Sequence, residues 1–170
     1  MKKILLLIIS LCFFNFISLA IFTFTVNHHF LDFGSVRLGE SSYGVPPENL
    51  RITCKSDQNR QWRLQIQSTG DLLFQDFVLP IKNLKWFGTY TNSIDLSGLS
   101  GHITSQTGRY FSKDIPTSLS SLGKVFYISD QTGDSSITSG TAVYLQFGVT
   151  VPETLPPGSY ISQIIITMTE

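Results

Sequence analysis

Apolar and polar residues alternate over two short stretches of the chain, 50–55 and 62–67. This two-residue period is typical of a strand with one face on a core and the other in water. The polar residues 56–59 between the stretches indicate a turn, so we predict that the two strands form a hairpin. The predicted inward-facing residues are Leu50, Ile52, Cys54, Trp62, Leu64 and Ile66.

The clearest alternation runs from Val143 to Val151, and it predicts a strand central to the core. Pro152 ends this strand because proline lacks a backbone donor, and the following Leu-Pro-Pro-Gly sequence predicts a reversal. We expect the β-branched run from Tyr160 to Met168 to pair with the strand before it. Weaker strand candidates are Phe22 to Val26, Leu31 to Val36, Phe77 to Ile81, Lys85 to Thr89 and Val125 to Ser129.

No stretch combines a helical period with caps and sufficient length, so the pattern favours an all-β fold. We predict an antiparallel immunoglobulin-like β-sandwich that forms a single domain over residues 21–170. The 170 residues suit one hydrophobic core. A Ser, Thr and Gly-rich stretch near 89–123 predicts an insertion across one end of the sandwich.

The first twenty residues have the three parts of a secretory signal peptide. Lys2 and Lys3 supply positive charge, an apolar run follows, and Ser18 and Ala20 are small residues at the positions a signal peptidase reads. We predict cleavage after Ala20 and therefore a secreted, periplasmic or cell-surface protein. A retained membrane anchor is the alternative, because the apolar run continues beyond residue 20.

The amino-acid composition argues against several classes of protein. Hydrophobic residues make up 42% of the chain and charged residues 14%, which is too apolar for a disordered protein. Clustered Lys and Arg residues, which nucleic acid or an anionic membrane surface requires, are absent after Lys3. We therefore predict no nucleic-acid partner, and contact with a membrane only through the signal peptide.

Cysteine usage argues against a disulfide. The chain has two cysteines, and Cys12 lies in the predicted leader. Cys54 would then be the single cysteine of the exported protein, so no disulfide within the chain can stabilise the domain. Its place in the alternation predicts a buried, unreactive thiol.

Two sets of motifs carry a resemblance to known families. The stretch from Leu31 to Glu40, LDFGSVRLGE, resembles the opening of bacterial immunoglobulin-like repeats. The second set of motifs consists of Ile52 to Ser56, Trp62 to Ile66, Phe147 to Pro152 and Pro157 to Tyr160. It looks like secreted bacterial sandwich domains of the pilin and spore-coat type. In those domains a Pro then Gly-x-Tyr turn introduces the last strand. The chain departs from pilins of the chaperone and usher class, which usually carry a disulfide.

Three groups of residues are candidates for binding. Trp86, Phe87 and Tyr90 could form an aromatic surface for glycans, although packing in the core is the interpretation that we favour. Asp130 and Asp134 resemble a calcium loop, but an ordinary Asp-Gly turn explains the same pattern. A third hypothesis is strand addition to another subunit by the segment containing Phe22, Phe24 and Val26; the alternative that we favour is that this is the domain's own first strand.

Catalytic and metal motifs are missing from the sequence. The adjacent His28 and His29 would point to opposite faces of a strand, and no metalloprotease, nucleophile-elbow, Walker or dinucleotide motif occurs. We therefore expect no enzyme and no cofactor. The favoured function is an exported structural or adhesive module of the bacterial cell surface, such as a fibre or coat subunit, whose partners are other surface proteins or its own copies. The alternatives are a secreted carbohydrate-binding module and an exported hydrolase using carboxylates such as Asp71, Asp76 and Asp95.

Overall fold

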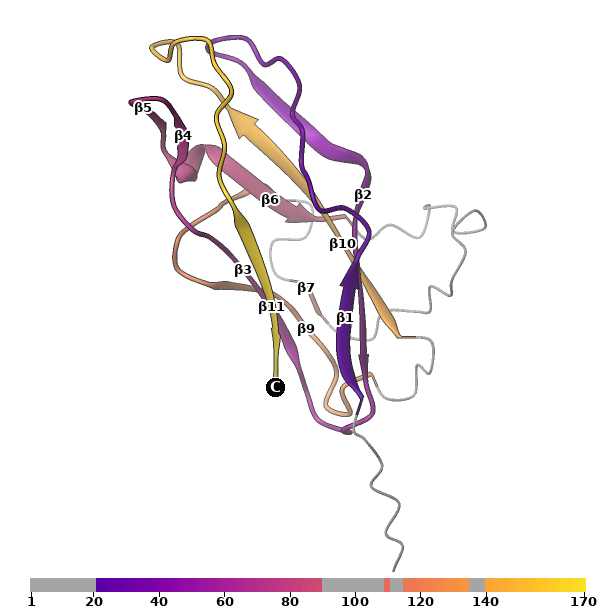
Figure 1. Cartoon of the computed structure of the whole chain (residues 1–170). Helices are drawn as coiled ribbons and strands as arrows, with labels where there is room; N and C mark the ends of the chain where they lie inside the picture. The colour runs from indigo at the N-terminus through magenta and orange to yellow at the C-terminus, as the bar shows by residue number, and fades with distance from the viewer. Residues whose placement is uncertain (1–20, 90–108, 111–114, 135–139) are drawn as a thin grey trace, which may run out of the picture.

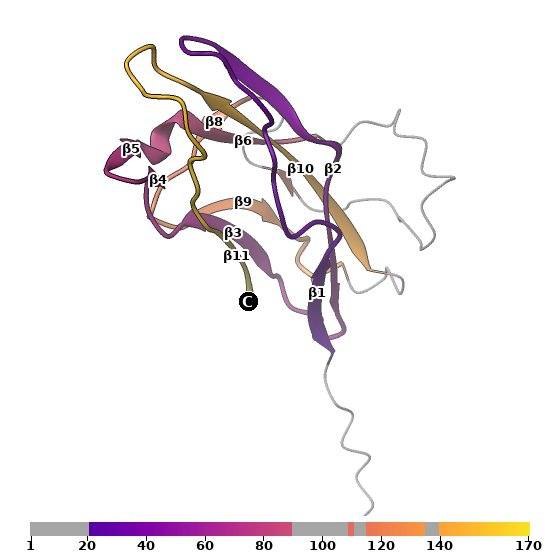
Figure 2. The same ribbon diagram turned by 45° about the horizontal axis from the view of Figure 1, so that its top comes forward.

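A computed structural model describes residues 21–89, 109–110, 115–134 and 140–170. Within these residues the regular structure consists of antiparallel strands and one short 3-10 helix. Figures 1 and 2 show two sheets that face each other, which makes the fold all-β and sandwich-like. The predicted all-β antiparallel class is confirmed. The predicted leader and most of the predicted insertion lie outside the described residues.

The first sheet has the order β1-β2-β10-β6-β8. Its strands are β1 (Phe22–Val26), β2 (Ser41–Ser56), β10 (Thr141–Thr150), β6 (Leu84–Gly88) and β8 (Thr117–Ser118). β10 lies at the centre, between β2 and β6, in agreement with its almost entirely buried side chains.

The second sheet has the order β11-β3-β9-β7. Its strands are β11 (Ile164–Thr169), β3 (Arg63–Ser68), β9 (Lys124–Ile128) and β7 (Arg109–Tyr110). A small hairpin of β4 (Leu72–Phe74) and β5 (Phe77–Leu79), followed by the 3-10 helix η1 (Ile81–Asn83), connects β3 of this sheet to β6 of the first.

The core lies between the inner faces of the two sheets. All six residues predicted to face inward from 50–55 and 62–67 are buried, as are Phe147 and Val149 of β10. Aromatic rings join the layers: the Trp86 ring of β6 lies 5.9 Å from the Phe126 ring of β9, edge to face. The alternation therefore identified the inner face of each strong strand correctly.

Two predicted strand pairings are wrong. β2 and β3 do not form a hairpin, since they belong to opposite sheets, and β11 pairs with β3 instead of β10. β2 and β3 each have one apolar face. Because β2 and β3 lie in opposite sheets, their apolar faces are buried in the core between the sheets. A hairpin of β2 and β3 within one sheet would place both apolar faces on the same side, where another layer would have to bury them.

The predicted strand from Leu31 to Val36 is not a strand. The residues there have no regular secondary structure, Gly34 has a φ of +62°, and Leu31, Phe33 and Val36 pack against the core. Backbone hydrogen bonds attach the two ends of the segment, from the Asn27 amide to the Arg51 carbonyl and from the Gly39 amide to the Val151 carbonyl. In Figure 1 this segment is the dark line that continues from β1 past β2. It therefore covers the core with side chains rather than by extending a sheet.

Candidate functional site

Two of the three residues considered for an aromatic glycan surface are described by the structure, and they do not share one face. Trp86 is 1% exposed and packs on Phe126, so it cannot stack on a sugar. Phe87 is half-buried and follows Trp86 in β6, so the two side chains face opposite sides of the sheet. Tyr90 lies outside the described residues. The core packing that the sequence favoured for Trp86 is what the structure shows.

The predicted calcium residues form a hydrogen-bonded turn. Asp130 Oδ1 accepts hydrogen bonds from the Thr132 amide, the Thr132 hydroxyl and the Asp134 amide, each at 2.8 Å. Asp134 is 3% exposed, and its Oδ2 accepts a 2.7 Å hydrogen bond from the Thr141 hydroxyl. Among the residues that the structure describes, no group of three or more His, Cys, Asp or Glu side chains could hold a metal ion. Calcium binding by this pair stays a prediction.

This turn is packed against the core by a neighbouring tryptophan. The Trp62 indole N–H donates a 2.9 Å hydrogen bond to the Gly133 carbonyl. Gly133 has a φ of +66°, and a Cβ at this position would lie 2.1 Å from the Arg60 carbonyl oxygen. Only glycine fits this backbone and this close approach. The backbone conformation and the packing of the turn therefore explain why position 133 is a glycine.

Cys54 is buried in the core as predicted. Its side chain is 1% exposed, and the described part of the chain contains no other cysteine. Burial raises the pKa of the thiol far above its ordinary value, and the negative charge of Asp134 raises it further. The thiol is therefore neutral at physiological pH and is a poor nucleophile.

Two of the three carboxylates considered for a hydrolase, Asp71 and Asp76, lie at the two ends of β4. Asp71 accepts a 2.7 Å hydrogen bond from the Ile81 amide, which fixes the start of η1. Asp76 is exposed in the β4–β5 turn, and Asp95 lies outside the described residues.

The segment containing Phe22, Phe24 and Val26 is β1, and it pairs with β2 of its own chain. The register runs from Phe22 opposite Ser56 to Val26 opposite Ile52. The segment could reach another subunit as a donor only by leaving this sheet. In this structure its outer edge borders a groove instead.

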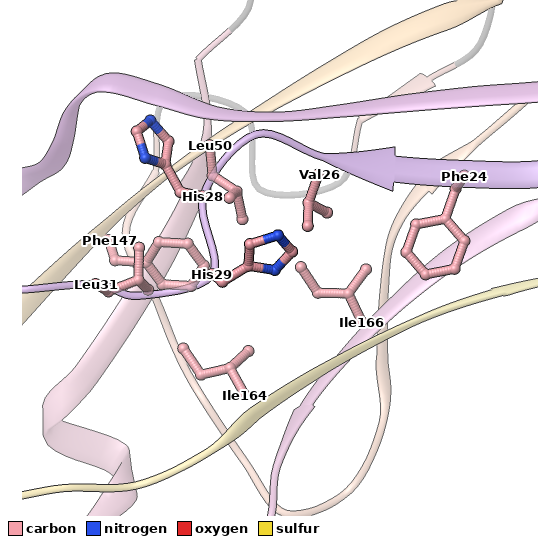
Figure 3. A pocket seen from close by; sticks show the side chains of 9 residues that line it. All are labelled: Phe24, Val26, His28, His29, Leu31, Leu50, Phe147, Ile164 and Ile166. Atoms are coloured by element: carbon pink, nitrogen blue, oxygen red, sulfur yellow. The ribbon is translucent and has the colours of Figure 1, made fainter.

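This edge groove lies between the two sheets where the sandwich is not closed. Its walls come from β1, from residues 28–31 and from β11, and its floor comes from β2 and β10. It has a volume of about 230 Å³. Figure 3 shows the side chains that line it, which are Phe24, Val26, His28, His29, Leu31, Leu50, Phe147, Ile164 and Ile166.

Two strand edges flank the edge groove. β1 is the outermost strand of the first sheet and β11 is the outermost strand of the second, so within the described residues neither has a second neighbouring strand. Such an edge presents backbone N–H and C=O groups in a row that can pair with another chain. The groove therefore offers both backbone partners and an apolar surface.

The histidines contribute little metal-binding chemistry to the edge groove. In Figure 3 the His29 ring points between Val26 and the two isoleucines of β11, while the His28 ring lies on the other side of the backbone. The two rings therefore do not converge on one ion, as expected from their adjacency. The groove suits apolar side chains better than a polar metabolite.

The edge groove is not predictable from the alternation of apolar and polar residues alone. The local signal for it is that apolar residues occupy both faces of the last strand, with Ile164 and Ile166 on one face and Ile165 on the other. Whether such residues are covered depends on which strands lie at the sheet edges. That order follows from the pairing of β11 with β3, which is a long-range property.

A comparison with models of known protein families gives no match to the chain, and a comparison with curated proteins likewise gives none. In the described part of the chain, no helix has the length and apolar character needed to cross a membrane.

Proposed function

We propose that this chain is an exported, non-catalytic structural subunit of the bacterial cell surface, which associates with its own copies or with other surface proteins through the edge groove. Residues 1–20 serve as a leader, and the domain that remains is an immunoglobulin-like sandwich. The observation that carries the proposal is the pairing of an apolar groove with two strand edges.

A β-strand from a second molecule is the occupant that matches this surface. Its backbone would pair with the edge of β11 or β1, and every second side chain would enter the edge groove. Phe24 is 38% exposed, and Ile164 and Ile166 are half-buried, so apolar surface on both walls still contacts water. Covering this surface supplies the free energy for association.

In such an assembly the first strand accepts a partner strand and does not act as the donor. β1 is an acceptor edge, because its other edge already pairs with β2 over five residues. The donor strand must therefore come from a different segment or a different protein.

Sedimentation velocity on the mature chain, over a series of concentrations, tests the proposal. We expect self-association, and we expect Phe24→Lys to weaken it by about tenfold or more, since a charge would enter an apolar contact. Thr25→Lys is the matched control. It adds the same charge to the next residue of β1, whose exposed side chain faces away from the groove.

Two results would contradict the proposal. One is a wild-type protein that stays monomeric at its highest soluble concentration and captures no strand from the surface proteins of its source organism. The other is association that Phe24→Lys and Thr25→Lys weaken equally. Circular dichroism of both variants verifies that the sheets are intact.

A further inference from the structure

An exposed tyrosine packs on a glycine at the outer face of the first sheet, on the side away from the core. Tyr43 of β2 is directly opposite Gly148 of β10, and a Cβ at position 148 would lie 2.1 Å from Tyr43 Cδ1 and 2.5 Å from its Cε1. The ring therefore packs against the glycine backbone, which only a residue without a side chain permits. The side chain of Tyr43 remains 45% exposed.

Polar groups surround the hydroxyl end of this ring. Lys85 of β6 is opposite Gly148, and its Nζ donates a 3.3 Å hydrogen bond to the Tyr43 hydroxyl oxygen. The hydroxyls of Ser41 and Thr150 lie 2.8 Å apart across β2 and β10. Hydrogen bonding from Thr150, and to a smaller extent from Lys85, lowers the pKa of Tyr43. The three strands thus place a cation and hydroxyl donors beside one aromatic face.

We infer that this tyrosine platform, formed by Tyr43, Gly148, Lys85, Ser41 and Thr150, binds an acidic sugar residue of the uronic acid type. A flat ring supported from below can stack on the apolar face of a pyranose. The Lys85 ammonium matches the sugar carboxylate, and the two hydroxyls can hydrogen bond with the sugar hydroxyls. A neutral sugar would use the ring and leave the cation without a partner from the ligand.

The position of the platform makes it independent of the edge groove. The groove opens between the sheets, whereas Tyr43 and Lys85 lie on the outer surface of the first sheet. One molecule could therefore use both surfaces at once. Loss of sugar binding leaves the proposed association through the groove untouched, and the reverse also holds.

Isothermal titration calorimetry on the mature protein tests this inference. The probes are an oligosaccharide containing glucuronic acid and a neutral N-acetylglucosamine oligomer of equal length. We expect the acidic probe to bind about tenfold more tightly than the neutral one, which corresponds to one charge-assisted contact. Equal affinity for the two probes, or no heat from either one, would overturn the inference.

Four variants assign the contacts. Tyr43→Leu keeps apolar cover over Gly148 but removes the flat ring, so binding should weaken by about tenfold, while Tyr43→Phe should stay within about threefold of the wild type. Lys85→Gln should abolish the preference for the acidic probe. Lys82→Gln, which removes an exposed lysine from η1, should preserve it. Unchanged binding by Tyr43→Leu, or a preserved preference in Lys85→Gln, counts against the platform.

Discussion

The middle of the sandwich and its β1–β11 side bury their apolar residues to very different extents. Phe126 and Leu145 in the middle are 0% exposed, whereas Phe24 on β1 is 38% exposed and Ile165 on β11 is 39% exposed. Strands in the middle have neighbours on both sides as well as an opposing sheet, while among the residues that the structure describes β1 and β11 each have a strand on one side only. The fold therefore concentrates its stability in the middle and leaves apolar surface exposed at the β1–β11 side.

Truncating a ring in the middle should give the largest effect. Phe126→Ala removes a completely buried ring that packs on Trp86, and we expect it to lower the free energy of unfolding by about 3–5 kcal/mol. The control is Thr150→Ala, which loses hydrogen bonding to Ser41 and Tyr43 at the sheet surface and should cost only about 1 kcal/mol. Urea titrations measure both, and equal losses would contradict the proposed layering.

The buried thiol of Cys54 makes the stability of the middle of the sandwich depend on alkaline pH. The pKa of Cys54 is raised in the folded state above its ordinary value of 9.0. The thiol therefore contributes stability that is fully present below pH 9.0 and is lost as the pH rises, because the unfolded chain ionises first. Between pH 9 and 10 the resulting loss in the free energy of unfolding is at most about 1.4 kcal/mol.

Comparison with Cys54→Ala isolates this contribution from other groups that titrate in the same range. The free energy of unfolding of the wild type should fall more steeply above pH 9 than that of the variant. Parallel pH profiles for the two proteins would show that Cys54 is accessible to solvent. Rapid labelling of native Cys54 by a thiol reagent would lead to the same conclusion.

These buried positions are the part of the fold that the sequence predicts well. Alternation identifies a face of each strand by local geometry, and Leu50, Ile52 and Trp62 are buried as expected. Strand order is different, because it depends on contacts between distant segments. The predicted hairpin of β2 with β3 was wrong for this reason.

The residues around Tyr43 explain why the tyrosine platform is not predicted from the sequence. β2 begins at Ser41, nine residues before the start predicted from alternation, and this early part contains Gly44, Pro46 and Pro47. Glycine and proline normally indicate turns, so the pattern hid the strand. Gly44 has a φ of +81°, and the pairing of β10 with β2 shifts register near this point. A strand that contains such irregularities is recognisable only once its partner is known.

The smallest effect is expected at the wall of the edge groove. Ile164 of β11 is half-buried and borders the groove, so Ile164→Ala removes apolar atoms that are already partly in water. We expect a loss of about 1 kcal/mol in the free energy of unfolding, below the range of about 2–5 kcal/mol for a fully buried isoleucine. The measurement is a urea titration at a concentration where the protein is monomeric.

Measuring the stability of Ile164→Ala at several protein concentrations separates two roles of Ile164, which are packing within the monomer and contact with a partner strand. If a partner strand covers Ile164 in the assembly, the loss caused by Ile164→Ala should grow as the protein concentration rises, because association stabilises the folded state by mass action. A loss equal to that of Phe126→Ala in the monomer would mean that the chain itself fills the groove in solution. The difference between the middle of the sandwich and its edge would then disappear, and with it the reason to expect a partner there.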